Sequence, residues 1–334
     1  MYLYIFVAVI LLAFELVYFK IADKFNIIDK PNERSSHSTI VLRGGGIIFT
    51  LSMIVWAVIM QLQGNDITSY LPFLIGLSLI AGVSFWDDVQ SLPDTVRLLF
   101  HFVAMALMFW SVGIMHWSMW WMVLVGLIIC VGATNIINFM DGINGITGGY
   151  ALAVLFPLLL LNMSLSFIEE SYPIVAAIGV LVFCIFNFWP KGKAKCFAGD
   201  VGSIGIAFII LFAIGKLIIQ TGDITYLILL LVYGVDGCLT IIHRIMLHEN
   251  LGQAHRKHAY QLMANELKIG HVQVSLFYIT LQMAISLGFI FLCPNTVLAH
   301  WIYLIGAILF LAACYVLFMK KYYHLHEEYL ASLN

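Results

Sequence analysis

Apolar runs long enough to cross a membrane recur along the whole chain. A transmembrane helix needs about 20 mostly apolar residues, and eleven runs come near this length. They lie near residues 2–20, 45–62, 69–86, 96–115, 118–138, 146–164, 172–190, 202–220, 224–243, 271–293 and 297–319. Because the run at 118–138 closely follows its neighbour, the expected count is ten or eleven. The pattern predicts an all-α, polytopic transmembrane helix bundle, with residues 1–334 forming a single integral membrane domain.

The composition agrees with a chain that is surrounded by lipid. Hydrophobic residues make up 62% of the 334 residues, charged residues only 10%, and the mean hydropathy is +0.99. A soluble domain usually carries about 25% charged residues. The first apolar run lacks a basic n-region and a small-residue cleavage site, so we expect a first span and not a removed signal peptide. The lipid bilayer is therefore an expected partner, and nucleic acid is not.

Basic residues lie on one side of the predicted bundle. When successive connections are assigned alternately to two sides, one side receives residues 21–44, 87–95, 139–145, 191–201, 244–270 and 320–334. Of the 16 Lys and Arg residues, 15 lie in or at the edge of these segments, and Lys216 lies inside a predicted span. Lys and Arg concentrate in cytoplasmic loops. We therefore expect a multi-pass protein of the inner (cytoplasmic) membrane, with the N-terminus outside and the C-terminus in the cytoplasm.

Acidic and amide side chains gather near the cytoplasmic ends of the predicted spans. These residues are Asp87, Asp88, Asn135, Asn138, Asp141, Asp200 and Asp236. Carboxylates at that depth in a membrane are costly and mark a functional site by default. A single one could be a solvated helix cap, but five acids from four separate parts of the chain are harder to explain in that way. We interpret the group as a candidate active site at the cytoplasmic face.

The residue types in this group favour phosphate chemistry with a divalent cation. Carboxylate and amide oxygens suit Mg²⁺ or Mn²⁺ and not zinc. Glycine-flanked acids at 141–145 (DGING) and 199–203 (GDVGS) permit tight turns and a close approach of backbone to ligand. Arginines that can pair with phosphate oxygens are Arg34, Arg43, Arg97 and Arg256. The chain lacks the G-x-x-x-x-G-K-[ST] loop of an NTPase. The sequence therefore predicts a diphosphate handled with a metal ion at a membrane surface.

Four blocks of sequence resemble the polyprenyl-phosphate N-acetylhexosamine-1-phosphate transferases. They are DKPNERSSH at 29–37 with RGGG at 43–46, DD at 87–88 with LP at 92–93 and RLL at 97–99, NIINFMDGING at 135–145, and FAGDVGS at 197–203. A looser fifth block runs from Asp236 through His243 and Arg244 to HRKHAYQ at 255–261. The third and fourth blocks together are the most specific part of this resemblance.

The resemblance implies a reaction and a set of residue functions. A UDP-N-acetylhexosamine would lose UMP, and its sugar 1-phosphate would join a polyprenyl phosphate such as undecaprenyl phosphate, with Mg²⁺ required and Mn²⁺ as the alternative. By position, Asp200 and Asn138 resemble the metal ligands. Asp87 and Asp88 resemble the catalytic pair that acts on the acceptor phosphate, and their separate functions are left open. The implied substrate-binding residues are Arg43, Arg97, Asn135, Asp141, Asn144 (toward uracil), His255, Arg256 and His258.

Some positions depart from the pattern of the family and narrow the expected branch. Asn144 stands where many bacterial relatives carry Asp, and the first loop has Thr39-Ile40 where a proline is usual. The HRKHAYQ motif differs from the histidine-rich form of enzymes that use the muramyl-pentapeptide donor. The chain is more similar to the branch that starts O-antigen (lipopolysaccharide), capsule or related surface polysaccharides, which implies UDP-GlcNAc, UDP-FucNAc or UDP-QuiNAc as donor.

Two other classes of membrane protein fit parts of the pattern. A secondary transporter with a cytoplasmic-side polar site fits the span count, but transporters place their sites near the midplane, often with inverted repeats. A CDP-alcohol phosphotransferase needs aspartates and glycines on consecutive helical turns, whereas here the acids are spread over distant segments. The Mg²⁺-dependent phosphotransferase is therefore the favoured function and the transporter the alternative. The oligomeric state, including a homodimer, is open.

Overall fold

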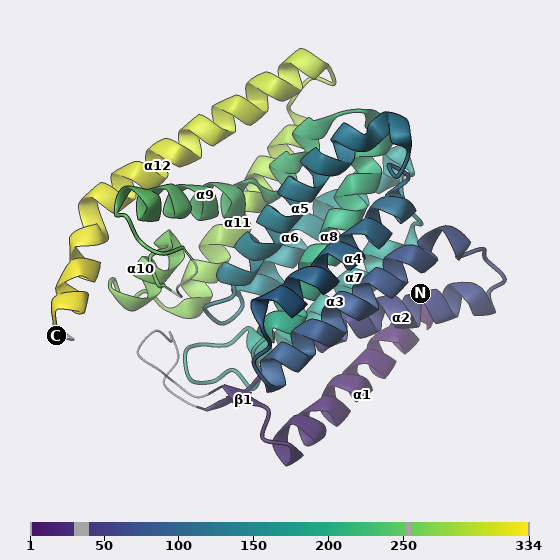
Figure 1. Ribbon diagram of the computed structural model, residues 1–334, viewed down its shortest axis with the longest axis horizontal. Helices are drawn as coiled ribbons and strands as arrows, with labels where there is room; N and C mark the ends of the chain where they lie inside the picture. The colour runs from purple at the N-terminus through teal and green to yellow at the C-terminus, as the bar shows by residue number, and fades with distance from the viewer. Residues whose placement is uncertain (1, 30–39, 252–254, 333–334) are drawn as a thin grey trace.

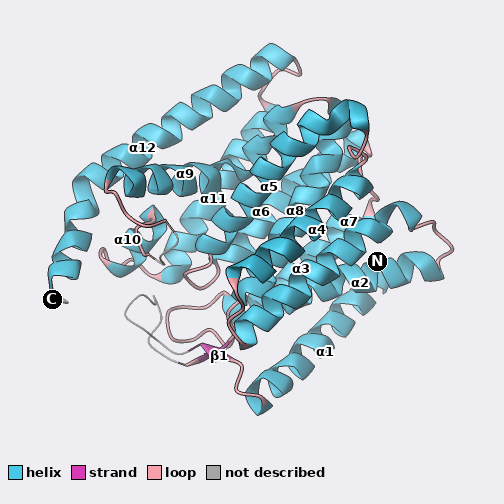
Figure 2. Cartoon of the chain, viewed as in Figure 1, coloured by secondary structure: helices cyan, strands magenta, loops and turns pink. Residues whose placement is uncertain are grey.

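Helices make up most of the described chain (Figure 2). A computed structural model describes residues 2–29, 40–251 and 255–332. The helices are α1 (Tyr2–Lys24), α2 (Ile47–Leu62), α3 (Leu71–Val89), α4 (Asp94–Val112), α5 (Trp120–Phe139), α6 (Ile146–Leu165), α7 (Ser171–Asn187), α8 (Gly199–Thr221), α9 (Leu231–Met246), α10 (Ala259–Asn265), α11 (His271–Phe291) and α12 (Val297–Ser332). Short 3₁₀ helices are η1 (Thr68–Tyr70), η2 (Trp117–Met119) and η3 (Ile224–Leu230), and the strands are β1 (Ile28–Asp29) and β2 (Val41–Leu42).

Each of the eleven predicted runs contains a helix, so the predicted all-α membrane bundle is confirmed. Within the described residues, nine helices are long and apolar enough to cross a membrane, while α2 and α7 have only 16 and 17 residues. Several predicted boundaries were misplaced: α1 continues to Lys24, α3 to Val89, α9 to Met246 and α12 to Ser332, and α8 begins at Gly199. Hydropathy alone misses these ends because each extension carries polar or charged residues.

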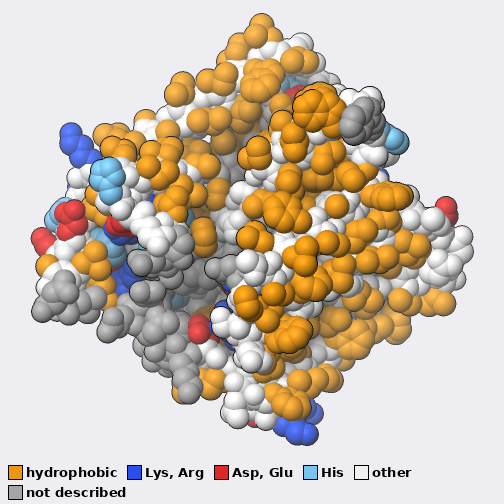
Figure 3. All heavy atoms as spheres, viewed as in Figure 1, with side chains coloured by type: hydrophobic (Ala, Val, Ile, Leu, Met, Phe, Trp, Pro, Cys, Tyr) orange, Lys and Arg blue, Asp and Glu red, His pale blue; other side chains and the backbone are white. Residues whose placement is uncertain are grey.

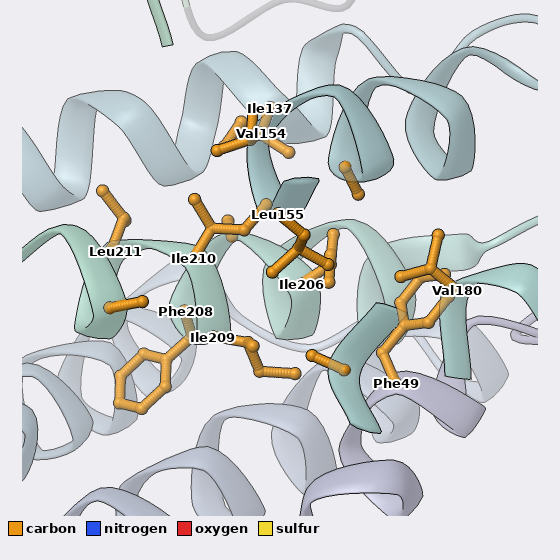
Figure 4. Close-up of a cluster of buried hydrophobic side chains, with 14 of the residues drawn as sticks. Phe49, Ile137, Val154, Leu155, Val180, Ile206, Phe208, Ile209, Ile210 and Leu211 are labelled. Atoms are coloured by element: carbon orange, nitrogen blue, oxygen red, sulfur yellow. The ribbon is translucent and has the colours of Figure 1, made fainter. Parts of the chain in front are cut away.

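Helix α8 lies at the centre of the bundle and α12 at its edge (Figure 1). In the apolar span of α8, 78% of the residues are buried, compared with 17% in that of α12. Figure 4 shows Phe208, Ile209, Ile210 and neighbouring α8 side chains packed among residues of α2, α5, α6 and α7. A helix that is apolar on every side must be surrounded by other elements. The central position of α8 therefore follows from its sequence, and its N-terminus is presented to several helices at once.

The outer surface is apolar over the helices and charged at one end of the molecule. Apolar side chains cover most of the visible face, and charged groups and histidines gather over the end of α12 (Figure 3). In Figure 1, β1, α10 and the C-terminus lie toward one end of the bundle. An apolar belt of this kind fits the hydrocarbon core of a bilayer. The chain is therefore a multi-pass membrane protein.

A small sheet brings the segment before α2 against the start of α8. Strands β1 and β2 pair antiparallel, with Ile28 opposite Leu42. Leu42 forms a parallel bridge with Cys196, and its carbonyl accepts a hydrogen bond from the Phe197 N–H at 2.8 Å. The first and fourth sequence blocks are thus adjacent in space. Residues 30–39, including the predicted phosphate-binding Arg34, lie outside the described residues.

Candidate active site

The carboxylate of Asp88, in the last turn of α3, lies against the beginning of α8. Its Oδ1 accepts a hydrogen bond from the Asp200 N–H (2.9 Å), and its Oδ2 accepts one from the Val201 N–H (3.0 Å). The first N–H groups of a helix lack partners within the helix and favour a negative charge. Nε of Arg43 lies 2.8 Å from Oδ1, and the Asp88 side chain is fully buried. Asp88 therefore holds together α3, α8 and the segment before α2.

Glycines allow the three backbones to approach one another here. Gly199 has a φ of +71°, in the left-handed region that favours glycine, and a Cβ on it would lie 2.6 Å from Oδ2 of Asp88. A Cβ on Gly46 would lie 2.3 Å from the Cα atom of Gly202. The sequence suggests these glycines as places for a ligand, and the structure gives them a packing function.

Asp87 has different partners from Asp88. Its Oδ1 accepts a hydrogen bond from the Leu92 N–H (2.7 Å), and its Oδ2 lies 3.1 Å from Nη1 of Arg97. The side chains of Asp87 and Arg97 are 9% and 31% exposed, so this pair is more accessible than the fully buried Asp88. The geometry therefore separates two adjacent carboxylates whose functions the sequence left open. Asp88 contacts the N-terminus of α8 and Arg43, whereas Asp87 contacts Leu92 and Arg97.

Asp200 and Asn138 lie beside the same face of α8. Asp200 is in the first turn of the helix, and its Oδ1 lies 3.9 Å from Nη2 of Arg43. Oδ1 of Asn138, from the end of α5, accepts a hydrogen bond from the Ser203 hydroxyl at 2.6 Å. Ser203 follows Asp200 by three residues and therefore lies on the same side of the helix. The structure thus brings the two predicted metal ligands toward each other from separate helices.

This donor set fits a magnesium ion and does not resemble a zinc site. Among the residues that the structure describes, no three His, Cys, Asp or Glu side chains are arranged to hold a metal ion. Mg²⁺ needs no such group, since it usually takes one or two carboxylates and completes its shell with water and substrate phosphates. The carboxylate of Asp200 and the amide oxygen of Asn138 meet that requirement.

Asp141 lies in the turn between α5 and α6, close to the other acids. Its Oδ1 accepts a hydrogen bond from the Thr147 hydroxyl at 2.5 Å. Burial, together with the negative charges of Asp200 and Asp88, raises the pKa of Asp141 to about 7 in spite of that hydrogen bond. A carboxyl group with this pKa can exchange a proton near neutral pH. Asp141 therefore belongs to the same electrostatic cluster as Asp88 and Asp200.

The side chain of Asn144 holds the loop after α5 in place. Its amide nitrogen donates to the carbonyl oxygens of Trp189 (2.8 Å) and Pro190 (3.1 Å), and the residue is 2% exposed. Its backbone N–H donates to Nδ1 of His271 at 3.3 Å. The predicted contact with uracil stays a prediction, and the geometry favours a structural function for this side chain.

His255 and His258 turn toward the end of α5. Their ring centroids lie 6.0 and 6.5 Å from that of Phe139 and 5.0 Å from each other. Burial, together with the neighbouring His258 and Arg244, lowers the pKa of His255 to about 3, so this ring is neutral near pH 7. The Tyr260 hydroxyl donates to the Phe139 carbonyl oxygen at 2.8 Å. The fifth sequence block therefore lies against the third.

Arg256 turns the other way, toward the C-terminal end of α12. Its Nη2 lies 2.9 Å from Oε1 of Glu266, and its guanidinium carbon lies 4.3 Å from the ring centroid of Tyr329. The same Glu266 oxygen is 3.1 Å from Nδ1 of His326. The side chains of Arg256, Glu266 and His326 are 11%, 4% and 1% exposed. The predicted substrate contact of Arg256 stays a prediction, and the geometry favours an anchor between this loop and α12.

We expect Arg256→Met to lower the midpoint of thermal unfolding in detergent, because it leaves the carboxylate of Glu266 buried without its cation. Removing one partner of a buried ion pair costs about 3–5 kcal/mol. The matched control is Lys193→Met, which changes an exposed basic residue of the segment before α8 and should leave the midpoint unchanged. An unchanged midpoint for Arg256→Met together with a higher KM for the donor would return Arg256 to the substrate-binding group.

A cavity of about 280 Å³ opens between α4 and α5. Its lining residues are Arg97, Leu98, His101, Phe102, Val131 and Asn135. Leu98 and Phe102 are exposed apolar residues of the lipid-facing surface, while Arg97 at the other end pairs with Asp87. Asn135, predicted to bind substrate, thus lies on this cavity. The cavity leads from the apolar surface of the bundle to a carboxylate–arginine pair.

Two residues that contact the histidine segment had no function assigned from the sequence. Asp236 belongs to the fifth block, but nothing in its spacing indicates its partner. A Cβ on Gly142 would lie only 2.2 Å from the hydroxyl oxygen of Tyr260. The close contact of this tyrosine with Gly142 therefore sets the position of the loop after α5. Both contacts join segments more than 20 residues apart. The only sequence signal for the contact of Tyr260 would have been the pairing of a glycine with a buried aromatic residue.

Comparison with known proteins relates the chain to a family of membrane transferases. The profile of glycosyl transferase family 4 matches residues 70–218, which contain the second, third and fourth blocks. A probable undecaprenyl-phosphate N-acetylglucosaminyl 1-phosphate transferase of Bacillus subtilis (strain 168) is 25% identical over 73% of this chain and 72% of its own. A decaprenyl-phosphate N-acetylglucosaminephosphotransferase of Mycobacterium leprae is 25% identical over 75% and 72%. A phospho-N-acetylmuramoyl-pentapeptide-transferase of Thermotoga neapolitana is 28% identical over 60% and 68%.

The helical membrane fold and these matches define the class of the protein, a polytopic membrane transferase. The match to glycosyl transferase family 4 and the similarity to these relatives support the polyprenyl-phosphate hexosamine-1-phosphate transferase family, which confirms the resemblance read from the sequence blocks.

Proposed function

We propose that this enzyme transfers an N-acetylhexosamine 1-phosphate from a UDP-sugar to a polyprenyl phosphate and releases UMP. The observation that carries the proposal is the contact between Asp88 and the N-terminus of α8. It holds Asp200 and Arg43 close to each other, on the same side of the bundle as the cavity that Arg97 and Asp87 close. Two of the relatives are named for the transfer of an N-acetylglucosamine phosphate, one with undecaprenyl phosphate and the other with decaprenyl phosphate.

The acceptor is proposed to enter through the cavity between α4 and α5. Its isoprenoid chain would lie along Leu98 and Phe102, and its phosphate would pair with Arg97. A phosphate monoester is already largely ionised near pH 7, since its second pKa is about 6. The nucleophilic oxygen therefore needs no strong base. Asp87 keeps the Arg97 guanidinium directed toward the cavity.

The bond changes at the donor are a single phosphoryl substitution. An oxygen of the acceptor phosphate attacks the phosphorus that carries the sugar, and the bridging P–O bond to UMP breaks. UMP leaves with the bridging oxygen, and the product is a polyprenyl diphosphate sugar. On the protein, Arg43 and the N-terminus of α8 supply positive potential near the diphosphate, and His255 and His258 line the side next to Phe139.

Mg²⁺ is the proposed cofactor, with Mn²⁺ as the alternative, and Asp200 and Asn138 would hold it. When bound, such an ion neutralises charge on the transferred diphosphate. Arg43 lies beside the carboxylates of Asp88 and Asp200 and offsets part of their negative charge. Water and substrate oxygens would supply the other ligands of such an ion.

We also propose an inner-membrane location with the site in the cytoplasm, the N-terminus outside and the C-terminus inside, because the basic segments lie at that end. For the donor, the loop histidines favour UDP-GlcNAc, UDP-FucNAc or UDP-QuiNAc, as in the branch that starts O-antigen or capsule synthesis. A homodimer is a further proposal, which the mass of the purified particle in detergent can decide.

The test is UMP release by the purified protein in detergent with undecaprenyl phosphate and a panel of UDP-N-acetylhexosamines. We expect UMP only when lipid and Mg²⁺ are both present, and none with EDTA. The best donor in the panel identifies the sugar. If folded protein releases no UMP with any of these donors, including UDP-muramyl-pentapeptide, the transferase proposal is wrong. Uptake by proteoliposomes would then test the transporter alternative.

A further inference from the structure

Asp236 is a buried carboxylate that the proposed reaction does not use. It lies in α9 and is 3% exposed. Its Oδ1 lies 3.2 Å from Nδ1 of His258 and accepts hydrogen bonds from the Ala259 N–H and the Thr240 hydroxyl, each at 3.2 Å. Its Oδ2 accepts one from the Tyr278 hydroxyl at 2.5 Å. One carboxylate therefore joins α9, the start of α10 and α11 to a single histidine.

The contact with Asp236 determines how His258 presents its ring. A carboxylate only accepts hydrogen bonds, so the nitrogen facing Asp236, Nδ1, carries a proton. The other nitrogen, Nε2, is buried and has no hydrogen-bond partner within the described part of the chain. Leaving a buried polar atom unsatisfied costs about 1–3 kcal/mol. An oriented ring with one satisfied and one unsatisfied nitrogen is therefore prepared for a ligand.

The surroundings of His258 indicate which ligand this is. Its ring lies 5.0 Å from that of His255 and 6.5 Å from that of Phe139, the last residue of α5. Phe139 lies between Asn138 and Asp141 in the third block. The ring that carries the unsatisfied nitrogen is thus beside the end of α5, which carries the candidate metal ligand Asn138, and His258 is not among the residues that line the α4–α5 cavity. The donor substrate, and not the acceptor lipid, is the ligand that fits this position.

We infer that Asp236 is a positioning residue for donor recognition, which holds His258 with Nδ1 protonated so that Nε2 contacts the sugar diphosphate of the UDP-sugar. This inference rests on the proposed function. It assigns the contact with the donor to Nε2 of His258, and it assigns the orientation of that ring to the carboxylate of Asp236 in α9. Replacing a residue that orients a functional histidine typically lowers affinity or activity by about 10- to 100-fold.

The test is a double-mutant cycle with Asp236→Asn and His258→Gln in the full chain, in detergent. UMP release gives kcat and the KM values for UDP-GlcNAc and undecaprenyl phosphate. Each single variant should raise the KM for the donor about 10-fold or more and leave the KM for the lipid within about twofold. The double variant should be no worse than His258→Gln alone, since Asp236 acts through His258. Additive effects in the cycle would overturn the inference.

Tyr278→Phe is the matched control, because it removes a hydrogen bond to Asp236 on the oxygen that does not face His258. Its donor KM should stay close to that of the wild type. A rise as large as that of Asp236→Asn would make Asp236 a general anchor and contradict the inference. If Asp236→Asn does not fold, Asp236→Glu, which displaces the carboxylate by one methylene, replaces it in the cycle.

Direct binding of UDP-GlcNAc, measured by calorimetry, separates this inference from the proposed function. If the wild type binds the nucleotide sugar but releases no UMP, the proposed reaction is wrong. The double-mutant cycle is then calculated from the dissociation constants for UDP-GlcNAc instead of the KM values. If the wild type is active and the cycle is additive, the reaction stands and the function given to Asp236 is wrong. Comparing UDP-GlcNAc with UDP shows whether Nε2 contacts the sugar or the diphosphate.

Discussion

Replacing Asp200 with asparagine is expected to lower kcat for UMP release by about a thousandfold and to leave the fold intact. The change keeps the shape of the side chain and removes one negative charge from the first turn of α8, where the side chain is 19% exposed. A divalent ion on a transferring phosphate contributes several kcal/mol. Losing about 4 kcal/mol of this corresponds to about three factors of ten in rate. The measurement is UMP release over a range of Mg²⁺ concentrations.

Asp66→Asn is the control for this prediction. Asp66 is an exposed acid in the connection after α2, at the opposite end of that helix from Arg43. Its replacement should change neither kcat nor the dependence on Mg²⁺. If Asp200→Asn kept the activity of the wild type with the same Mg²⁺ dependence, Asp200 could not be a metal ligand. A lower unfolding midpoint in Asp200→Asn would mean that the lower rate results from a less stable protein and not from the loss of a metal ligand.

Asp88→Asn is expected to abolish activity for a different reason, namely loss of the structure that carries the site. The carboxylate accepts from two backbone N–H groups of α8 and pairs with Arg43. The amide of asparagine carries an NH₂ group, which would face the backbone N–H groups of α8 instead of accepting from them. The neutral amide would also leave the Arg43 guanidinium without its negative partner. Breaking a buried ion pair costs about 3–5 kcal/mol. Because Arg43 is 34% exposed, we expect about 3 kcal/mol, seen as a lower unfolding midpoint in detergent.

Asp87→Asn provides the comparison, since it changes the neighbouring residue in the same way. Its partner Arg97 is 31% exposed, and its backbone contact is with Leu92 before α4. The unfolding midpoint should therefore stay near that of the wild type, while the KM for undecaprenyl phosphate should rise. Equal losses of stability in both variants would contradict the separation of functions between the two acids.

The periodicity and charge of the sequence were sufficient to predict the fold. Long apolar runs separated by basic segments leave few alternatives to a helical membrane bundle, because backbone polar groups in lipid must be paired within each span. The central place of α8 was not predicted, although its run is apolar on every side. The helix ends were misplaced where polar residues such as Asp88 and Asp200 extend a helix past its apolar part.

The candidate site was predicted as a set of residues, but the function of each depended on contacts that sequence does not contain. Adjacent carboxylates at 87–88 look equivalent in the sequence, and only the position of α8 distinguishes them. Arg256 and His258 are two residues apart in one motif, yet they face α12 and α5 respectively. Long-range pairs such as Arg256 with Tyr329 have no signal in local spacing.

The two halves of the site are built in different ways, and this bears on how donor preference can be altered by engineering. Around α8, backbone meets backbone at Gly46 and Gly202 with no space for a Cβ, so this half offers almost no position for randomisation. Around the histidines, side chains such as Tyr260 and Glu266 make the contacts. Libraries that seek a new sugar should therefore vary residues of this second half that face α5, such as His255, and keep the glycines and the Arg256–Glu266 pair fixed.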